Sequence, residues 1–245
     1  MLIDLKWPGI RIQAIFIWFI FLAPVSAQTA HDLRLGRELS IGGAGLGTFV
    51  LGRFIILEKP LDPLVIYYRS MVPGIDRIAL DRWSLSAHRT SDVLMSSSVV
   101  AALAVSVIVQ NGEQPLVPVA IIMESLLLTS GITSVVKHSV ARARPYVYEV
   151  DVPPGQRPEN GGLVSFWSGH TSTASSTTFA CASLVQRSNA SAGLKTATWI
   201  GAAVLPAAVG FFRVKAGRHF PTDVFTGYVF GAMIGIAVPY FHRID

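Results

Sequence analysis

Charged side chains are scarce in this sequence. Only 14% of its 245 residues are Asp, Glu, Lys or Arg, whereas 51% are hydrophobic. A soluble domain carries about 25% charged residues, so the composition excludes an ordinary soluble globular protein. The mean hydropathy of +0.50 indicates instead an integral membrane protein with a single domain.

Cysteine and basic tracts are also in short supply. The single cysteine, Cys181, cannot form an intramolecular disulfide, and its stretch of small apolar residues indicates a packed thiol. The net charge of +5 is modest, and no basic run interleaved with aromatic residues occurs. The sequence therefore does not indicate binding to nucleic acid.

The N-terminus resembles an export signal. Lys6 and Arg11 precede an apolar run, and the small-residue sequence Ala-Pro-Val-Ser-Ala follows at 23–27. Residues 1–27 are therefore predicted to be either a cleaved signal peptide or an uncleaved signal anchor. In both cases the chain is directed to a bacterial inner membrane, and residues 28–245 form the membrane-embedded domain.

Five later segments are apolar enough and long enough to cross a bilayer core, which takes about 20 residues. They cover residues 93–110, 115–136, 169–186, 195–213 and 223–241. A further segment, 41–57, is rich in glycine and carries Arg53, so it either crosses or lies in the interface. The predicted fold is all-α, a polytopic membrane bundle of six helices, or of five helices plus an interfacial helix.

Two polar stretches interrupt the apolar pattern. Residues 58–92 mix charges, prolines and apolar side chains, which is typical of an amphipathic stretch on the membrane face or of a plain connecting loop. Residues 146–167 are rich in Pro and Gly and are predicted to form a loop over the site. Glu124 lies inside an apolar segment, where a carboxylate is costly, so we expect it to pair with a buried cation such as Arg53.

Polar residues with one kind of chemistry stand at the ends of these segments. Lys137 follows the second segment, His170 opens the third, Arg213 closes the fourth and Asp223 opens the fifth. If consecutive segments alternate in direction, all four residues lie on the same membrane face. The topology alone therefore predicts one shared site.

This set of residues suits the cleavage of a phosphoester. Arg144 and Arg213 can hold phosphate oxygens with bidentate guanidinium groups, and Lys137 can add a point charge. Phosphoryl transfer also needs a nucleophile and a proton for the leaving oxygen, which a neutral imidazole and an imidazolium can supply.

The spacing of the remaining residues supports the same chemistry. Asp223 follows His219 by four residues, so its carboxylate can approach one ring nitrogen and fix the tautomer. Gly169 lets backbone amides approach an anion near a helix start, and Ser168 can add a hydroxyl.

Three motifs carry a resemblance to a known family. Lys137-x6-Arg144-Pro145, Ser168-Gly169-His170 and Arg213-x5-His219-x3-Asp223 together resemble the type 2 phosphatidic acid phosphatase superfamily. That superfamily includes membrane lipid phosphatases, bacterial acid phosphatases and vanadium-dependent haloperoxidases.

The resemblance implies a phosphohistidine mechanism without a metal or other cofactor. It assigns His219 as the nucleophile, Asp223 as its orienting partner and His170 as the general acid. It implies phosphate binding by Lys137, Arg144, Ser168, Gly169 and Arg213.

Two positions depart from the family pattern. Trp167 stands where a proline is usual, and Phe212 stands where a serine is usual. Every charged or catalytic position is kept, so we interpret the changes as affecting the shape of the pocket and the choice of substrate. Trp167 and Phe166 are expected either to line an apolar entrance for a lipid tail or to be interfacial aromatics.

A site at membrane depth predicts a substrate that diffuses within the bilayer. The phosphates of phosphatidic acid, phosphatidylglycerol phosphate, undecaprenyl pyrophosphate and lipid A all fit, and the sequence does not select among them. Two alternatives use the same residues. One is a vanadate-dependent haloperoxidase, and the other is a non-catalytic membrane protein that binds lipids or anions.

The charge of one loop predicts the orientation of the chain. Arg187 and Lys195 flank a loop without acidic residues, and the positive-inside tendency assigns such a loop to the cytoplasm. The motif face then looks onto the periplasm. Helix counting from an exported residue 28 agrees with this only if 41–57 lies in the interface.

Overall fold

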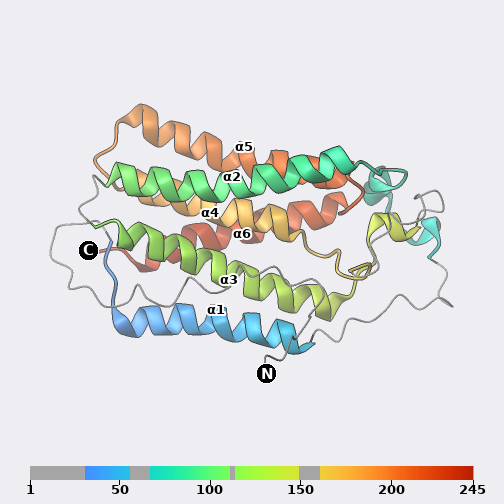
Figure 1. Cartoon of the computed structure of the whole chain (residues 1–245), viewed down its shortest axis with the longest axis horizontal. Coiled ribbons are helices and arrows are strands. Elements are labelled where there is room, and N and C mark those ends of the chain that lie inside the picture. The colour runs from blue at the N-terminus through green and yellow to red at the C-terminus, as the bar shows by residue number, and fades with distance from the viewer. Residues whose placement is uncertain (1–30, 56–66, 111–113, 149–160, 245) are drawn as a thin grey trace, which may run out of the picture.

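The computed structural model describes residues 31–55, 67–110, 114–148 and 161–244, which form a bundle of six long helices with roughly aligned axes (Figure 1). The helices are α1 (Leu35–Ile55), α2 (Leu85–Val109), α3 (Leu116–Val140), α4 (Gly169–Gln186), α5 (Ala192–Lys215) and α6 (Pro221–Phe241). The predicted all-α six-helix bundle is confirmed. Residues 1–27, the predicted signal, lie outside the described residues.

Four of these helices, α2, α3, α5 and α6, are long and apolar enough to cross a membrane. The protein is therefore a multi-pass membrane protein. Helix α4, which covers the predicted crossing segment 169–186, is too polar to be counted among those four. It contacts α2, α3, α5 and α6 and so lies inside the bundle. Most of its hydroxyls donate to carbonyls one turn earlier, as Thr178 does to Ala174 at 2.8 Å. This bonding satisfies the polar groups within the helix itself.

Three glycines of α6, spaced four residues apart, lie against the backbone of α4. A Cβ atom would be 2.6 Å from the Ser168 carbonyl oxygen at Gly227 and 2.5 Å from that of Ser172 at Gly231. At Gly235 it would overlap the carbonyl oxygen of Ser176. Only glycine permits this approach, which holds the first turn of α6 beside the first turn of α4.

Helix α1 runs alongside α3 and along the bundle, whereas an interfacial helix would lie across the end of the bundle (Figure 1). Glycines again mediate the contact, because a Cβ at Gly131 of α3 would lie 2.6 Å from the carbonyl oxygen of Gly45. Helix α1 is not among the four helices that are long and apolar enough to cross a membrane, so its place in the bilayer, crossing or interfacial, stays a prediction. Close glycine packing on α3 sets the direction of this segment.

Helix α2 begins at Leu85, eight residues before the start of the predicted segment. The side chain of Ser84 caps it by accepting a hydrogen bond from the Ala87 amide at 3.2 Å. The first turns of α2 are polar, so they are not part of an apolar run and the sequence did not predict them as helix. The described part of the preceding connection contains two short 3-10 helices, Arg69–Met71 and Gly74–Ala79.

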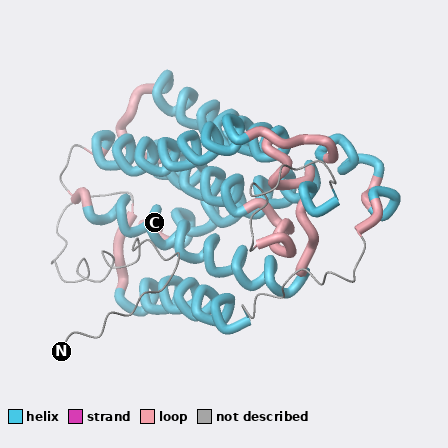
Figure 2. Tube along the Cα trace, turned by 45° about the vertical axis from the view of Figure 1, so that its right-hand side comes forward, coloured by secondary structure: helices cyan, strands magenta, loops and turns pink. Residues whose placement is uncertain are grey.

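The direction of the helices alternates along the chain. Helices α3 and α5 end where α2, α4 and α6 begin, on the right in Figure 1. Several connections, drawn in pink in Figure 2, gather at this end of the bundle. The alternation assumed from the sequence therefore holds, and it brings the motif residues to one end.

Candidate active site

His219 lies in the tight turn between α5 and α6 and is 1% exposed. The turn depends on Gly217, whose φ of +68° lies in the left-handed region that favours glycine. A Cβ at this position would also overlap the carbonyl oxygen of Arg82. The turn is therefore pressed against the segment that precedes α2, which fixes the position of His219.

Asp223, in the first turn of α6, is held by three donors. Its Oδ2 accepts hydrogen bonds from Ser165 Oγ at 2.6 Å and from the Phe220 amide at 2.9 Å. Its Oδ1 accepts a hydrogen bond from Arg142 Nη1 at 2.6 Å. The carboxylate is fully buried and oriented before any ligand arrives.

The predicted contact between His219 and Asp223 is present but long. His219 Nδ1 lies 3.6 Å from Asp223 Oδ2 and has no hydrogen-bond partner among the described residues. This distance exceeds that of a hydrogen bond, although catalytic contacts often shorten only when substrate binds. Because Nδ1 faces the carboxylate, Nε2 is the nitrogen available for attack.

Burial lowers the pKa of His219 well below its usual range, and the nearby cations Lys137, Arg144 and Arg213 lower it further. The imidazole is therefore neutral at physiological pH. A neutral ring keeps the lone pair that a nucleophile needs.

His170, in the first turn of α4, faces a carboxylate that the sequence interpretation missed. Its Nε2 lies 2.8 Å from Oδ1 of Asp92 on α2. Asp92 is also a polar residue near the start of an apolar segment, four residues after His88. The motif residues were recognised as polar residues at the ends of predicted helices. Asp92 would have met the same description if α2 had been predicted to begin at residue 85.

Arg213, near the end of α5, points at the same part of α2 and is 3% exposed. Its Nη1 donates to His88 Nδ1 at 2.9 Å and lies 3.3 Å from Ser91 Oγ and 3.4 Å from Asp92 Oδ1. His88 lies in the first turns of α2, which the sequence did not predict as helix. Its ring accepts a hydrogen bond from the buried guanidinium.

The other two predicted phosphate-binding cations reach the same region. Lys137 Nζ donates to the Val164 carbonyl at 2.7 Å, and Arg144 Nη1 donates to the Arg218 carbonyl at 3.4 Å. The buried Nε groups of Arg144, Arg213 and Arg218 have no hydrogen-bond partner within the described part of the chain. Buried donors normally have partners, so this set is suited to an anion.

Ser168 and Gly169 form the start of α4. Ser168 is its N-cap, and its Oγ accepts hydrogen bonds from the Thr171 hydroxyl at 2.9 Å and the Thr171 amide at 3.4 Å. A Cβ at Gly169 would meet Lys137 Cε at 3.5 Å, which is ordinary contact. The Lys137 side chain therefore passes close to the helix start, where amides are available to an anion.

Arg142 was interpreted as part of a general positive field or as an interfacial anchor. In the structure Arg142 instead donates to Asp223 at 2.6 Å and to Asp76 at 2.7 Å. Asp76 is 1% exposed and also accepts a hydrogen bond from the Thr222 amide at 3.0 Å. This Asp76–Arg142–Asp223 chain holds the start of α6, and the sequence offered no signal for Asp76 or for Ser165.

Trp167 neither lines an entrance nor lies at the interface. It is 4% exposed, donates from Nε1 to Thr133 Oγ1 at 2.7 Å, and stacks on Phe230 at a centroid distance of 4.6 Å. Both earlier interpretations of Trp167 are wrong. The residue that replaces the family proline packs the motif segment between α3 and α6.

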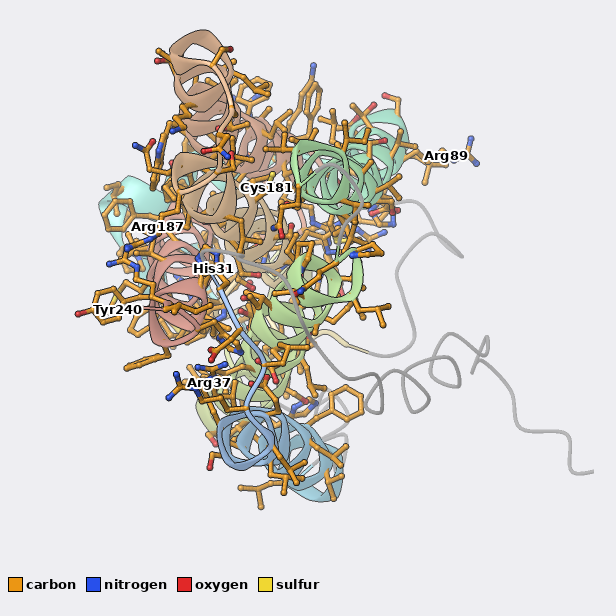
Figure 3. All side chains as sticks on the ribbon, turned by 90° about the vertical axis from the view of Figure 1, so that its left-hand side faces the viewer. His31, Arg37, Arg89, Cys181, Arg187 and Tyr240 are labelled. Carbon is orange, nitrogen blue, oxygen red and sulfur yellow. The ribbon has the colours of Figure 1, made fainter. Side chains whose placement is uncertain are left out.

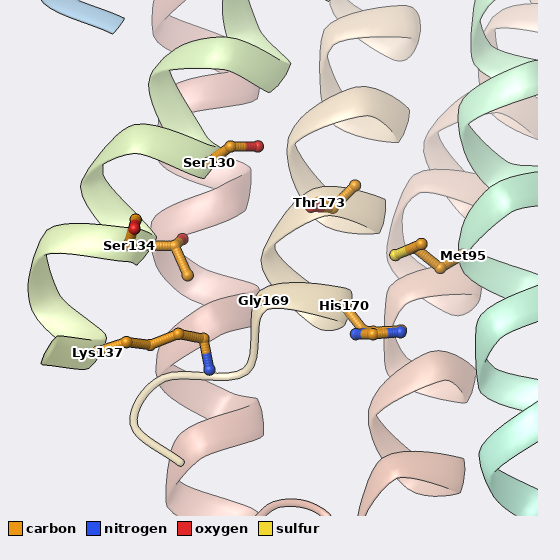
Figure 4. A pocket seen from close by; sticks show the side chains of 8 residues that line it. Met95, Ser130, Ser134, Lys137, Gly169, His170 and Thr173 are labelled. Atoms are coloured by element: carbon orange, nitrogen blue, oxygen red, sulfur yellow. The ribbon is translucent and has the colours of Figure 1, made fainter. Parts of the chain in front are cut away.

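A cavity of about 260 Å³ adjoins the predicted site (Figure 4). It is lined by Met95, Ser130, Thr133, Ser134, Lys137, Gly169, His170 and Thr173. These residues belong to α2, α3 and α4, so the cavity lies between membrane helices. Lys137 and His170, both labelled in Figure 4, border it.

A protein-family model matches the part of the chain that carries the three motifs. The PAP2 superfamily model matches residues 118–244, which cover α3 to α6 and all three motifs. The chain belongs to the PAP2 superfamily. This membership supports a phosphatase of the membrane lipid branch.

A solved structure has the same fold. It is a transmembrane PAP2-type phosphatidylglycerolphosphate phosphatase from Bacillus subtilis, with a TM-score of 0.50 and 21% identity. The match covers 83% of this chain and 96% of the other. A search of curated proteins finds no match.

Proposed function

We propose that this protein hydrolyses a phosphomonoester or pyrophosphate on a membrane lipid through a phosphohistidine intermediate, without a metal. One observation carries the proposal. Two histidines on different elements, His219 and His170, accompany buried guanidinium groups whose Nε donors have no partner among the described residues. An anion with the charge of a phosphate would supply those missing acceptors.

The proposed reaction has two steps. In the first, His219 Nε2 attacks phosphorus, the bond to the ester oxygen breaks, and that oxygen takes a proton from His170. Asp92 accepts from His170 Nε2, which leaves Nδ1 to donate. In the second step, water attacks the phosphohistidine and gives a proton to His170. Phosphate then leaves and His219 becomes free again.

The cations stabilise the equatorial oxygens of the transferring group in both steps. Lys137, Arg144 and Arg213 are the proposed ligands of these oxygens, together with Ser168 and Gly169 at the helix start. Asp223 would stabilise the positive charge that develops on His219 during attack.

The proposed substrate is a lipid because the cavity lies between membrane helices. A head group can enter from the bilayer while its chains stay in the hydrocarbon. Phosphatidic acid, phosphatidylglycerol phosphate, undecaprenyl pyrophosphate and the phosphates of lipid A all belong to this class. A panel of these four substrates in detergent, with released phosphate as the readout, would rank them.

Substitution of the two histidines tests the mechanism. His219→Ala should abolish both phosphate release and acid-labile labelling of the protein by a radioactive phosphate donor. His170→Ala should reduce release about 10²–10⁴-fold, the usual contribution of a general acid, and should still permit labelling by a donor with a good leaving group.

EDTA should leave the initial rate unchanged, and vanadate should inhibit. Phosphate release that survives both substitutions would refute the mechanism, as would halide oxidation by the vanadate-loaded protein.

We further propose that the site faces the periplasm of a bacterial inner membrane. The opposite end of the bundle, viewed in Figure 3, carries Arg37 and Arg187, and Arg34, Lys195 and Arg243 belong to segments at the same end. The loop between α4 and α5 carries Arg187 and Lys195 and no acidic residue, and the positive-inside tendency assigns such a loop to the cytoplasm. Because α1 runs along the bundle, residue 31 then starts on the cytoplasmic side. A periplasmic site therefore requires that residues 1–27 do not cross the membrane, because a cleaved signal peptide and a crossing anchor both start residue 31 on the outside.

A further inference from the structure

A second cluster of ionisable residues lies at the end of the bundle opposite the phosphatase site. Glu38 comes from the first turn of α1, Glu124 from α3, and His242 directly follows α6. All three are buried, with exposed fractions of 3%, 6% and 0%. One potential ligand atom from each residue lies within 4.8 Å of the others. The sequence predicted a buried cation such as Arg53 as the partner of Glu124. The partner that the structure gives Glu124 is His242.

The hydrogen bonds of this cluster leave one carboxylate unsatisfied. His242 Nε2 lies 3.0 Å from Glu38 Oε2 and 3.1 Å from Glu124 Oε2. A protonated Nε2 carries one hydrogen, and its hydrogen bond goes to Glu38. Neither oxygen of Glu124 accepts a hydrogen bond from any described residue. One imidazolium N–H shared by two buried carboxylates leaves Glu124 with an ion-pair contact but no well-formed hydrogen bond, which is unfavourable.

The surroundings orient each ligand toward a common point. His242 Nδ1 donates to the Val238 carbonyl at 2.8 Å, which directs Nε2 into the cluster. Glu38 Oε1 accepts from the Arg34 amide at 3.0 Å and from Arg37 Nε at 3.1 Å, so Oε2 is the oxygen that faces inward. Outer hydrogen bonds of this kind are the usual support of metal-binding histidines and carboxylates.

The separations also fit a shared cation. Two ligands that each bind a metal at about 2.1 Å lie about 3.0–3.4 Å apart in octahedral or tetrahedral geometry. The two distances from His242 Nε2 fall at the lower end of this range. Two carboxylates and one imidazole form a mixed oxygen and nitrogen donor set, which suits Zn²⁺ or Mn²⁺.

We propose that Glu38, Glu124 and His242 bind one divalent transition-metal ion, Zn²⁺ or Mn²⁺, which fastens α1 and the C-terminal segment to α3. The two segments already meet there, because the Asp32 amide donates to the His242 carbonyl at 3.0 Å. Glu124 lies roughly 20 Å from Lys137 along α3, at 1.5 Å per residue. The ion is therefore structural and takes no part in phosphate chemistry.

Metal content and thermal stability of the full-length, tag-free protein in detergent test the proposal. Protein stripped with EDTA and then saturated with Zn²⁺ or Mn²⁺ should retain about one ion per chain after dialysis. Its Tm should rise by about 5–10 °C, as expected for saturation well above Kd in a protein of this size. Co²⁺ added to the stripped wild-type protein should give a visible absorption band, so this readout of metal binding needs no variant.

Glu124→Gln is the matched variant, because it keeps the shape of the side chain and removes its charge. It should lose the bound ion, the Tm rise and the Co²⁺ band, while its metal-free form should be at least as stable as metal-free wild type. His138→Gln is the control, since His138 Nδ1 makes the same four-residue contact, to the Ser134 carbonyl at 2.7 Å. It should bind metal as the wild type does.

Two results would overturn the proposal. The first is stripped wild-type protein whose Tm responds to neither ion and which gives no Co²⁺ band. The second is metal binding that survives in Glu124→Gln. Phosphate release is a separate readout, because metal-free protein at 25 °C should keep its initial rate within about twofold. A failed metal site would thus leave the phosphatase proposal untouched.

Discussion

Asp92 joins two parts of the candidate site that lie apart in the sequence. Its Oδ1 is 2.8 Å from His170 Nε2 and 3.4 Å from Arg213 Nη1. One carboxylate therefore orients the proposed general acid and lies beside a proposed phosphate ligand. It holds the imidazole in one tautomer and stabilises its protonated form, so Asp92 is a positioning residue.

Asp92→Asn should lower kcat for alkyl and lipid phosphates about 10–100-fold, because the general acid loses the partner that favours its charged form. The effect on p-nitrophenyl phosphate should be much smaller, since that leaving group needs no proton. Comparison of kcat and KM for the two substrate types measures this difference, and Asp92→Glu should restore part of the rate. An equal loss on both substrates would contradict the positioning role and indicate a structural defect.

The buried neutral His219 predicts how stability depends on pH. Burial, with the surrounding cations, lowers its folded-state pKa, so the unfolded chain binds more protons below its pKa of about 6.5. This contribution to stability is therefore complete above about pH 6.5 and is lost as pH falls, by up to about 1.4 kcal/mol per pH unit.

His219→Gln removes this pH-dependent contribution to the free energy of unfolding. Between pH 6.5 and 5.0, wild type should lose about 2 kcal/mol more than the variant, or roughly 4–8 °C in Tm. Thermal unfolding in phosphate-free buffers measures the difference, because bound phosphate would itself stabilise the site. Parallel pH profiles for the two proteins would show that His219 is not neutral in the folded state.

At the level of helices, the glycines of α6 determine how closely this helix approaches α4. Asp223 and Ser168 meet through this contact, as the Ser168 amide donates to the Asp223 carbonyl at 3.0 Å. Any separation of the two helices would move Asp223 away from the start of α4. Helix packing is thus a condition for the geometry of the site.

Gly231→Ala should destabilise the protein by about 1–3 kcal/mol, the usual cost of overpacking, because the new Cβ would lie 2.5 Å from the Ser172 carbonyl oxygen. It should also reduce kcat through displacement of Asp223. Gly201→Ala on α5 is the matched control, since its Cβ would meet no atom within 4 Å, and alanine favours the helix. The Tm and the rate of phosphate release are measured for both variants. Equal values in Gly231→Ala and Gly201→Ala would refute the role of this helix contact.

For the molecule as a whole, apolar runs and helix alternation predicted the six-helix bundle and the end at which the motifs meet. They did not predict the polar first turns of α2, where His88 and Asp92 lie, because hydropathy does not mark a polar turn that faces the protein interior. Asp76 and Ser165 contact Asp223 from distant connections, and their partners depend on tertiary packing. The position of Trp167 depends in the same way on Phe230 of α6.

The orientation of the whole molecule can be tested with single cysteines, since the native Cys181 is buried and Cys181→Ala provides a clean background. Ser70→Cys is exposed in the connection at the active-site end, and Asn189→Cys is exposed at the opposite end. A periplasmic site requires a membrane-impermeant maleimide to label Ser70→Cys in right-side-out vesicles and Asn189→Cys in inside-out vesicles.

The reverse labelling pattern would put the phosphatase site in the cytoplasm. The positive-inside tendency would then have failed at Arg187 and Lys195, and residue 31 would start outside, as either a cleaved signal or a crossing anchor requires. The mass of the purified chain gives an independent check, because loss of residues 1–27 agrees only with that reverse pattern when α1 crosses the membrane. A chain that lacks residues 1–27 would therefore contradict a periplasmic site, whereas a full-length chain agrees with either labelling pattern.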